Sequence, residues 1–98
     1  MGAALVAEIV VKAKIRTLLE RLGEFPASPE ALRDDADLHA AGLSSYGTVE
    51  LMVAIEEEFG VEFPDTLLTR ATFGSIEAVA AAVSSLVGAG AAAREEAA

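Results

Sequence analysis

The sequence predicts a small all-α domain of three main helices and one short helix, connected by one long first loop. Three observations support this fold class. Apolar residues recur at helical spacing in three segments, glycines and prolines separate these segments, and the partial strand-like alternation of residues 59–63 has no second strand to pair with. Because 98 residues fill one hydrophobic core, we expect a single domain over residues 1–87 and a disordered tail over residues 88–98.

The first helix is expected from about Ala3 to Leu22. Glu8 stands four residues before Lys12, which is a favourable pair on a helix surface, and Gly23 is a suitable C-terminal stop. The apolar residues of this segment recur at helical spacing and predict a buried face: Leu5, Ile9, Ile15, Leu18, Leu19 and Leu22.

A long loop follows and runs to about Ser44, because Pro26 and Pro29 keep the helix from resuming. A compact domain rarely leaves so long a segment without structure of its own, so we expect it to be anchored to the core. The candidate anchors are four apolar side chains: Phe25, Leu32, Leu38 and Leu43.

The remaining chain predicts a helix from Ser45 to Phe59 that ends at Gly60, and a short helical turn from Thr66 to Arg70. A final helix is expected from Ser75, as N-cap, to about Val87. Its buried face would be formed by Ile76, Val79, Val83 and Leu86.

The composition excludes several kinds of protein. Without cysteine the chain can form no disulfide, no Cys-ligated zinc site and no thiol nucleophile of its own, so any thiol chemistry has to come from an added group. No run of about 18 uncharged apolar residues is present to span a membrane. The start of the chain lacks a basic segment and is interrupted by Glu8, which argues against an export signal, so we expect a cytoplasmic protein.

The net charge of −9 is concentrated in the middle of the chain. No lysine or arginine stands between Arg33 and Arg70, whereas acids recur from Asp34 to Asp65. Such a surface repels nucleic acid and anionic lipid and attracts basic protein surfaces, so we expect neither nucleic acid nor a membrane as partner. The alternative is that the acids only keep an alanine-rich domain in solution.

The helix expected at residues 45–59 has two different faces. Its outward side presents Val49 and Val53 among glutamates at positions 50, 56 and 57, and an exposed apolar strip with an acidic rim is typical of a weak, electrostatically steered docking surface. The opposite side is the expected core stripe: Thr48, Leu51, Met52, Ile55 and Phe59.

Two serines stand where this helix begins. If Ser44 is the N-cap, Ser45 occupies the first helical position with its hydroxyl turned outward. A phosphate attached to Ser45 would be favoured by the positive end of the helix dipole and its unpaired N–H groups. The alternative is that the serines serve only as caps.

Two other residue sets carry no expected function. His39 with Asp34, Asp35 and Asp37 does not have the spacing of a metal-binding loop, so we assign no metal site. Ser45, His39 and Asp37 could form a catalytic set only in principle, because the sequence has neither a Gly-x-Ser-x-Gly elbow nor a strand to present one. We therefore assign no catalytic residue and do not expect an enzyme.

The segment from Asp37 to Asp65, DLHAAGLSSYGTVELMVAIEEEFGVEFPD, resembles the centre of the acyl carrier protein family. The shared features are the Gly-x-x-Ser helix start, the following Thr-Val-Glu-Leu, the Glu-Glu-Glu-Phe helix end and the Pro-Asp turn. The family's four-helix bundle would cover nearly the whole chain. Ser44, Tyr46 and Gly47 depart from the usual family pattern. The pattern Ala-Gly-Leu-Ser-Ser-aromatic is more similar to the small aminoacyl carrier proteins, which are charged by seryl-tRNA-synthetase-like ligases.

The resemblance implies that phosphopantetheine is attached to Ser45, with Ser44 as the less favoured alternative, and that its thiol holds an aminoacyl or acyl group as a thioester. It implies a monomeric cytosolic carrier whose partners are a phosphopantetheinyl transferase, an amino acid or acyl ligase, and a downstream transferase with basic docking patches. Two alternatives remain: a fatty-acyl or polyketide carrier of the same fold, and an unmodified acidic helical interaction module. The residues that match the family's partner contacts, here called the docking face, are Val49, Glu50, Val53, Glu56 and Glu57.

Overall fold

The computed structural model contains three α-helices: α1 (Gly2–Arg21), α2 (Ser45–Phe59) and α3 (Ile76–Ala97). Two single turns of 3-10 helix, η1 (Pro29–Ala31) and η2 (Asp65–Leu67), lie in the connections. The structure describes the backbone of residues 2–23 and 25–97 and the side chains of residues 7–23 and 25–88. Within these residues there is no strand, which confirms the all-helical prediction and leaves residues 59–63 as the end of α2 and a loop.

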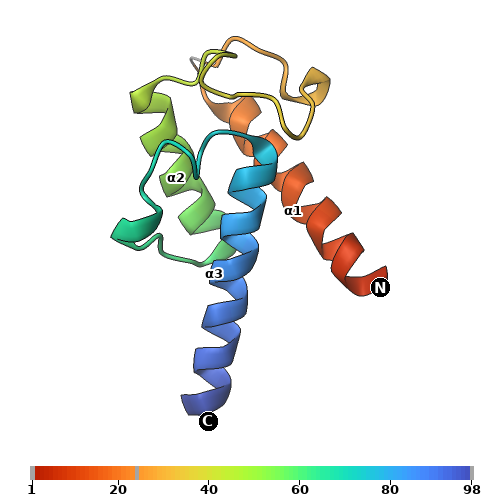
Figure 1. Cartoon of the computed structure of the whole chain (residues 1–98), viewed down its shortest axis with the longest axis vertical. Helices are drawn as coiled ribbons and strands as arrows, with labels where there is room; N and C mark the ends of the chain where they lie inside the picture. The colour runs from red at the N-terminus through yellow and green to blue at the C-terminus, as the bar shows by residue number, and fades with distance from the viewer. Residues whose placement is uncertain (1, 24, 98) are drawn as a thin grey trace.

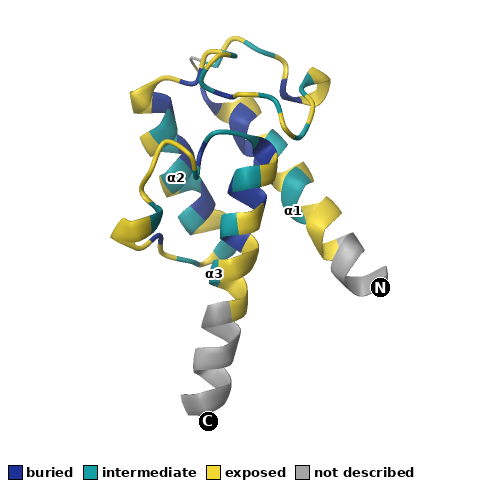
Figure 2. Cartoon of the chain, in the orientation of Figure 1, coloured by how far each residue is buried: buried dark blue, intermediate teal, exposed yellow. Residues whose placement is uncertain are grey.

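The three helices enclose one core in a molecule of 44 × 31 × 20 Å (Figure 1). α1 packs against both α2 and α3, and the chain between α1 and α2 crosses one end of the bundle. Buried residues line the inner sides of all three helices (Figure 2). The side chains with no exposed surface include Ile15, Leu19, Leu38, Leu51, Ile55, Ile76, Val79 and Val83.

Helix α2 has the expected bounds, and its ends have the expected local chemistry. Ser44 caps its start with extended backbone, and Gly60 ends it in the left-handed conformation with φ of 63°. Leu51 and Ile55 are buried, whereas Met52 and Phe59 are partly buried at the margin of the core. The predicted core stripe is therefore on the inner side of α2.

Helices α1 and α3 differ from expectation at their outer ends. Ile9, predicted to be buried, is 58% exposed, because the first turns of α1 diverge from the other helices (Figure 1). Leu5 and its predicted burial lie outside the described side chains. α3 does not stop near Val87 but continues to Ala97, over most of the segment that we expected to be a disordered tail. Alanine, which dominates that segment, is the strongest helix former.

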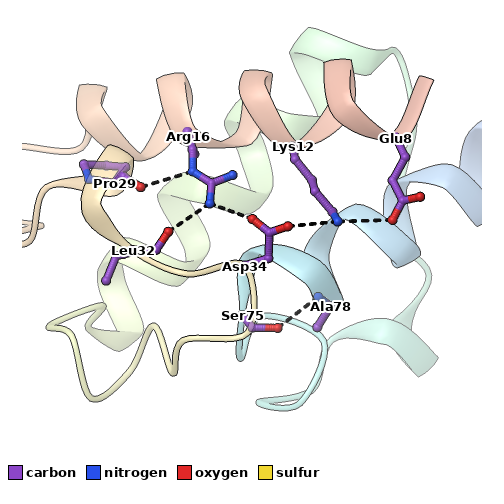
Figure 3. A network of polar contacts seen from close by, with 8 residues as sticks. All are labelled: Glu8, Lys12, Arg16, Pro29, Leu32, Asp34, Ser75 and Ala78. Atoms are coloured by element: carbon purple, nitrogen blue, oxygen red, sulfur yellow. Dashed lines mark hydrogen bonds and ion pairs between the residues drawn. The ribbon is translucent and has the colours of Figure 1, made fainter. Parts of the chain in front are cut away.

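The long loop is anchored by apolar and by polar contacts. Leu38 and Leu43 are buried and Phe25 and Leu32 partly buried, as predicted. The polar anchor was not predicted: Arg16 Nε donates to the carbonyl oxygen of Pro29 at 3.2 Å, and its Nη2 donates to the carbonyl oxygen of Leu32 at 2.9 Å (Figure 3). The loop is thereby fastened to the middle of α1.

The connection between α2 and α3 contains the single turn η2, so the short fourth helix expected at residues 66–70 is not confirmed. The last hydrogen bond of this turn runs from the N–H of Leu68 to the carbonyl oxygen of Asp65, at 3.1 Å. The hydroxyl of Thr69 then accepts a hydrogen bond from the N–H of Thr72 at 3.2 Å, which starts a separate turn. Ser75 caps α3 as predicted, since its hydroxyl accepts from the N–H of Ala78 at 3.0 Å (Figure 3).

Candidate functional site

The two serines at the start of α2 have different environments. The hydroxyl of Ser44 accepts a hydrogen bond from the N–H of Gly47 at 3.0 Å, and its carbonyl oxygen accepts from the N–H of Thr48 at 2.8 Å. Ser45 is the first residue of α2, and both serines are exposed. Ser44 therefore satisfies the helix end, and Ser45 presents a hydroxyl at that end.

Glycine at position 47 fits the close packing of this turn. A Cβ there would lie 3.1 Å from the Cδ1 atom of Leu43 and 3.3 Å from the hydroxyl oxygen of Ser44, which is tighter than ordinary van der Waals contact. Gly47 thus lets the buried Leu43 and the capping Ser44 approach the first turn of α2.

The loop before Ser44 has a fixed path. Gly42 has a φ of +119°, and a Cβ at this position would lie 2.5 Å from the Cγ atom of Pro26. Next in the chain, Leu43 N–H donates to the carbonyl oxygen of Leu38 at 2.9 Å. These contacts connect the position of the serines to the buried part of the long loop.

An open groove of about 510 Å³ lies beside Ser45, which is within the size range of small-molecule sites. One wall comes from the end of the long loop and from α2, and the other from the residues between η2 and α3. The second wall was not predicted as part of a site, because only the tertiary fold brings it next to α2. The groove is lined by His39, Leu43, Ser44, Ser45, Thr48, Val49, Met52, Leu68, Thr69, Arg70 and Phe73.

His39 and the nearby aspartates have structural contacts. His39 Nε2 lies 3.1 Å from the carbonyl oxygen of Arg70, which connects the two walls of the groove. The carboxylate of Asp37 accepts from the N–H groups of Ala40 and His39, and these bonds, that from Ala40 foremost, hold the pKa of Asp37 below its ordinary value. Among the described residues, no group of three or more possible metal ligands gathers.

Most side chains of the docking face are exposed on the outer side of α2. Val49 and Val53 are 55% and 44% exposed, Glu57 is exposed and Glu50 is partly exposed. Two further large side chains are also exposed and do not follow from the helical periodicity: Tyr46, next to Ser45 in the chain, and Leu68, in the groove wall.

Glu56 differs from the other residues of the docking face. Like Glu50 it is partly exposed, but its Oε2 atom accepts a hydrogen bond from the N–H of Phe63 at 2.8 Å. Its neighbour Glu58 forms an ion pair of 3.3 Å with Lys14 of α1. Glu50, Glu57 and Glu58, but not Glu56, line a second open groove of about 340 Å³ between α1 and α2.

The chain matches one protein-family model, described as the phosphopantetheine attachment site, over residues 11–83. A curated relative, the aminoacyl carrier protein of Agrobacterium fabrum, is 49% identical over 69 residues, which are 70% of this chain and 83% of the relative.

No helix among the described residues is both long and apolar enough to cross a membrane.

Two solved structures are similar in both fold and sequence. One is from a crystal structure of an engineered Bradyrhizobium japonicum glycine:[carrier protein] ligase in complex with a carrier protein from Agrobacterium tumefaciens and ATP. The TM-score is 0.72 and the identity 47%, over 76% of this chain and 96% of that one. The other is a solution structure of a protein from Agrobacterium tumefaciens, with a TM-score of 0.67 and 44% identity over 83% of this chain and 98% of that one.

Proposed function

Because the chain belongs to the phosphopantetheine attachment family, it is a carrier protein with a covalent phosphopantetheine group, and we propose that Ser45 is the attachment residue. The observation that carries this proposal is the division of roles between the two serines. Both serines are exposed, but Ser44 uses its hydroxyl as the N-cap of α2, whereas Ser45 occupies the first helical position after that cap.

The surroundings of Ser45 fit a phosphodiester. Ser44 accepts from the N–H of Gly47, but the N–H groups of Ser45 and Tyr46 precede the first intrahelical bond, and they and the positive end of the helix dipole favour an anion at this position. The first turn of α2, Ser-Tyr-Gly-Thr, contains no charged side chain. When attached, the group supplies the thiol that holds the cargo as a thioester, which a chain without cysteine cannot supply itself.

We propose that the cargo is an amino acid, loaded by an amino acid:carrier protein ligase. Two similarities support this proposal. The chain is 49% identical to an aminoacyl carrier protein. It is also 47% identical to a chain from the crystal structure of a glycine:[carrier protein] ligase in complex with a carrier protein. In this proposal a phosphopantetheinyl transferase modifies the carrier, the ligase charges it and a downstream transferase removes the amino acid. The chain itself catalyses none of these steps and works as a cytoplasmic monomer.

The docking face, apart from Glu56, is the proposed contact with these enzymes. Val49 and Val53 lie exposed along the same side of α2 as Ser45, and Glu50 and Glu57 add negative charge. Basic patches on the partners would be attracted to this surface, and the charge would accelerate encounter more than it would increase affinity.

Intact-mass measurement tests the attachment site. After incubation with coenzyme A and a phosphopantetheinyl transferase, the wild-type chain should gain the mass of one phosphopantetheine group. Ser45→Ala should gain none, and Ser44→Ala should still gain it, at a lower rate because its helix start is weakened. A gain in Ser45→Ala that disappears in Ser44→Ala would move the attachment to Ser44, and no gain in folded wild-type protein would contradict the proposal.

A charging assay tests the cargo. The modified protein is incubated with ATP and an amino acid:carrier protein ligase, first with glycine and then with other amino acids, and in parallel with a fatty acyl ligase and fatty acids. Thioester formation with an amino acid supports the proposal. The groove beside Ser45 includes Leu43, Met52 and Phe73, so a carrier of longer acyl groups is the competing outcome, and thioester formation with fatty acids alone would establish it.

A further inference from the structure

The chain that reverses after α2 is held by three hydrogen bonds to a single residue. The carbonyl oxygen of Glu56 accepts from the N–H of Gly60, the residue that ends the helix, and from the N–H of Val61 at 3.2 Å. The carboxylate of Glu56 then reaches the N–H of Phe63 at 2.8 Å. Glu56 thus supplies the acceptors for most of the turn that leads out of α2.

Phe63 connects this turn to the groove beside Ser45. Its side chain is buried, 5% exposed, and its ring centroid lies 5.4 Å from that of Phe73, which is 2% exposed. Phe73 forms part of the groove wall. A series of direct contacts therefore runs from the carboxylate of Glu56 through the backbone and ring of Phe63 to the wall of the groove.

We propose that Glu56 is a positioning residue, which fixes Phe63 and through it Phe73 in the groove wall, and not one of the docking carboxylates. The functional importance of the groove rests on the proposed carrier function. The hydrogen bond between Glu56 and Phe63 does not depend on that proposal. The feature that Glu56 needs for this role is a hydrogen-bond acceptor at the end of a side chain of this length. The negative charge of Glu56 is not required for this role. For Glu57, the next residue of the helix, the proposed docking role depends on the charge.

Charge and acceptor can be separated by substitution. Glutamine keeps a carbonyl acceptor at the same distance from the backbone and removes the charge, whereas alanine removes both. Glu56→Gln should therefore behave like the wild type, and Glu56→Ala should not. The matched controls are Glu57→Gln and Glu57→Ala, which change an exposed carboxylate on the same helix.

The first measurement is amide hydrogen exchange of Phe63 in the unmodified protein, by NMR. Loss of the acceptor in Glu56→Ala should accelerate exchange at Phe63 by about tenfold, which corresponds to one ordinary hydrogen bond. Exchange at Phe63 should stay within about threefold of the wild-type rate in Glu56→Gln and in both Glu57 variants. Wild-type exchange at Phe63 in Glu56→Ala would overturn the proposal.

The second measurement is the charging rate of the modified protein by the ligase at low and high salt. Glu56→Ala should be slower by about tenfold at both salt concentrations, and Glu56→Gln should stay within about twofold of wild type. Glu57→Gln should be slower only at low salt, since salt screens exposed charges. If Glu56→Gln lost as much rate as Glu57→Gln with the same salt dependence, Glu56 would be a docking residue.

Failure of the Glu56 proposal can be distinguished from failure of the Ser45 proposal. Hydrogen exchange uses unmodified protein, so it tests the contact even if Ser45 carried no group. If Glu56→Ala did not fold, the comparison of Glu56→Gln with Glu57→Gln would still distinguish a positioning role from a docking role.

Discussion

Arg16 and Asp34 lie in direct contact, with 2.7 Å between Nη2 of the arginine and Oδ1 of the aspartate. The second carboxylate oxygen of Asp34 lies 3.0 Å from Nζ of Lys12, one turn earlier in α1 (Figure 3). The carbonyl oxygen of Asp34 accepts from the N–H of Glu77, in the first turn of α3, at 2.9 Å. Asp34 therefore joins α1, the long loop and α3 at the end of the bundle that carries Ser45.

Replacing Arg16 with lysine should lower the free energy of unfolding by about 1 to 2 kcal/mol, because one ammonium group cannot reproduce the bonds to Pro29, Leu32 and Asp34. Urea denaturation followed by circular dichroism measures the difference. The matched control is Arg33→Lys, since Arg33 is 83% exposed and pairs only at the surface with Asp35. Equal effects of the two substitutions would contradict a special role for Arg16.

Acid should destabilise the protein in part through Asp34. Hydrogen bonds from Arg16 first and from Lys12 second hold the pKa of Asp34 below its ordinary value in the folded state. The unfolded chain then binds the proton more readily, so this contribution is present above the unfolded pKa of about 4 and is lost as the pH falls through the lower folded pKa. Asp34→Asn should be less stable than wild type at pH 7, and the difference should shrink as the pH falls through the lowered folded pKa of Asp34, in urea titrations at a series of pH values. Parallel pH profiles would contradict this assignment.

Local chemistry explains why the sequence predicts the helices well. Ser44, Gly60 and Ser75 act on their own helix ends through bonds to residues within four positions, and such contacts can be inferred from spacing alone. The path of the long loop depends instead on Arg16, which reaches Pro29 and Asp34 across 13 and 18 positions. Nothing in the local pattern selects those partners.

In the candidate site too, some positions can be inferred from local sequence and others depend on the tertiary fold. The positions of Ser45, Val49 and Val53 follow from helical periodicity once the start of α2 is known. The bond of Glu56 to Phe63 and the approach of Phe73 to the groove depend on how the chain reverses after α2. Periodicity therefore assigned Glu56 to the outer surface, and its contact with the following turn could only be found in the fold.

Gly42→Ala should lower the free energy of unfolding by about 1 to 3 kcal/mol, because the residue has a positive φ of 119° and a Cβ would overlap the ring of Pro26. The measurement is urea denaturation. Gly88→Ala is the control: it lies in α3 with no atom within 4 Å of the added Cβ, and it should raise stability by up to about 1 kcal/mol. A neutral Gly42→Ala would mean that the loop before Ser44 tolerates a different path.

Ser44→Ala should lower the free energy of unfolding by about 1 kcal/mol, the usual effect of losing an N-cap. Ser45→Ala should change it by less than about 0.5 kcal/mol, because Ser45 is exposed and Ser44 already caps the helix. Thermal or urea denaturation of the unmodified variants measures both. The opposite ranking would show that the capping roles of the two serines are exchanged.

Glu57→Lys should slow charging by the ligase by about tenfold at low salt without changing the fold, since it reverses a charge on the exposed side of α2. The loss should largely disappear at about 1 M salt, where the screening length is about 3 Å. Glu20→Lys makes the same change in net charge at an exposed position of α1 outside the docking face, and it should stay within about threefold of wild type. Equal losses in both variants would show that the enzyme responds to net charge. An undiminished rate in Glu57→Lys at low salt would remove Glu57 from the docking face.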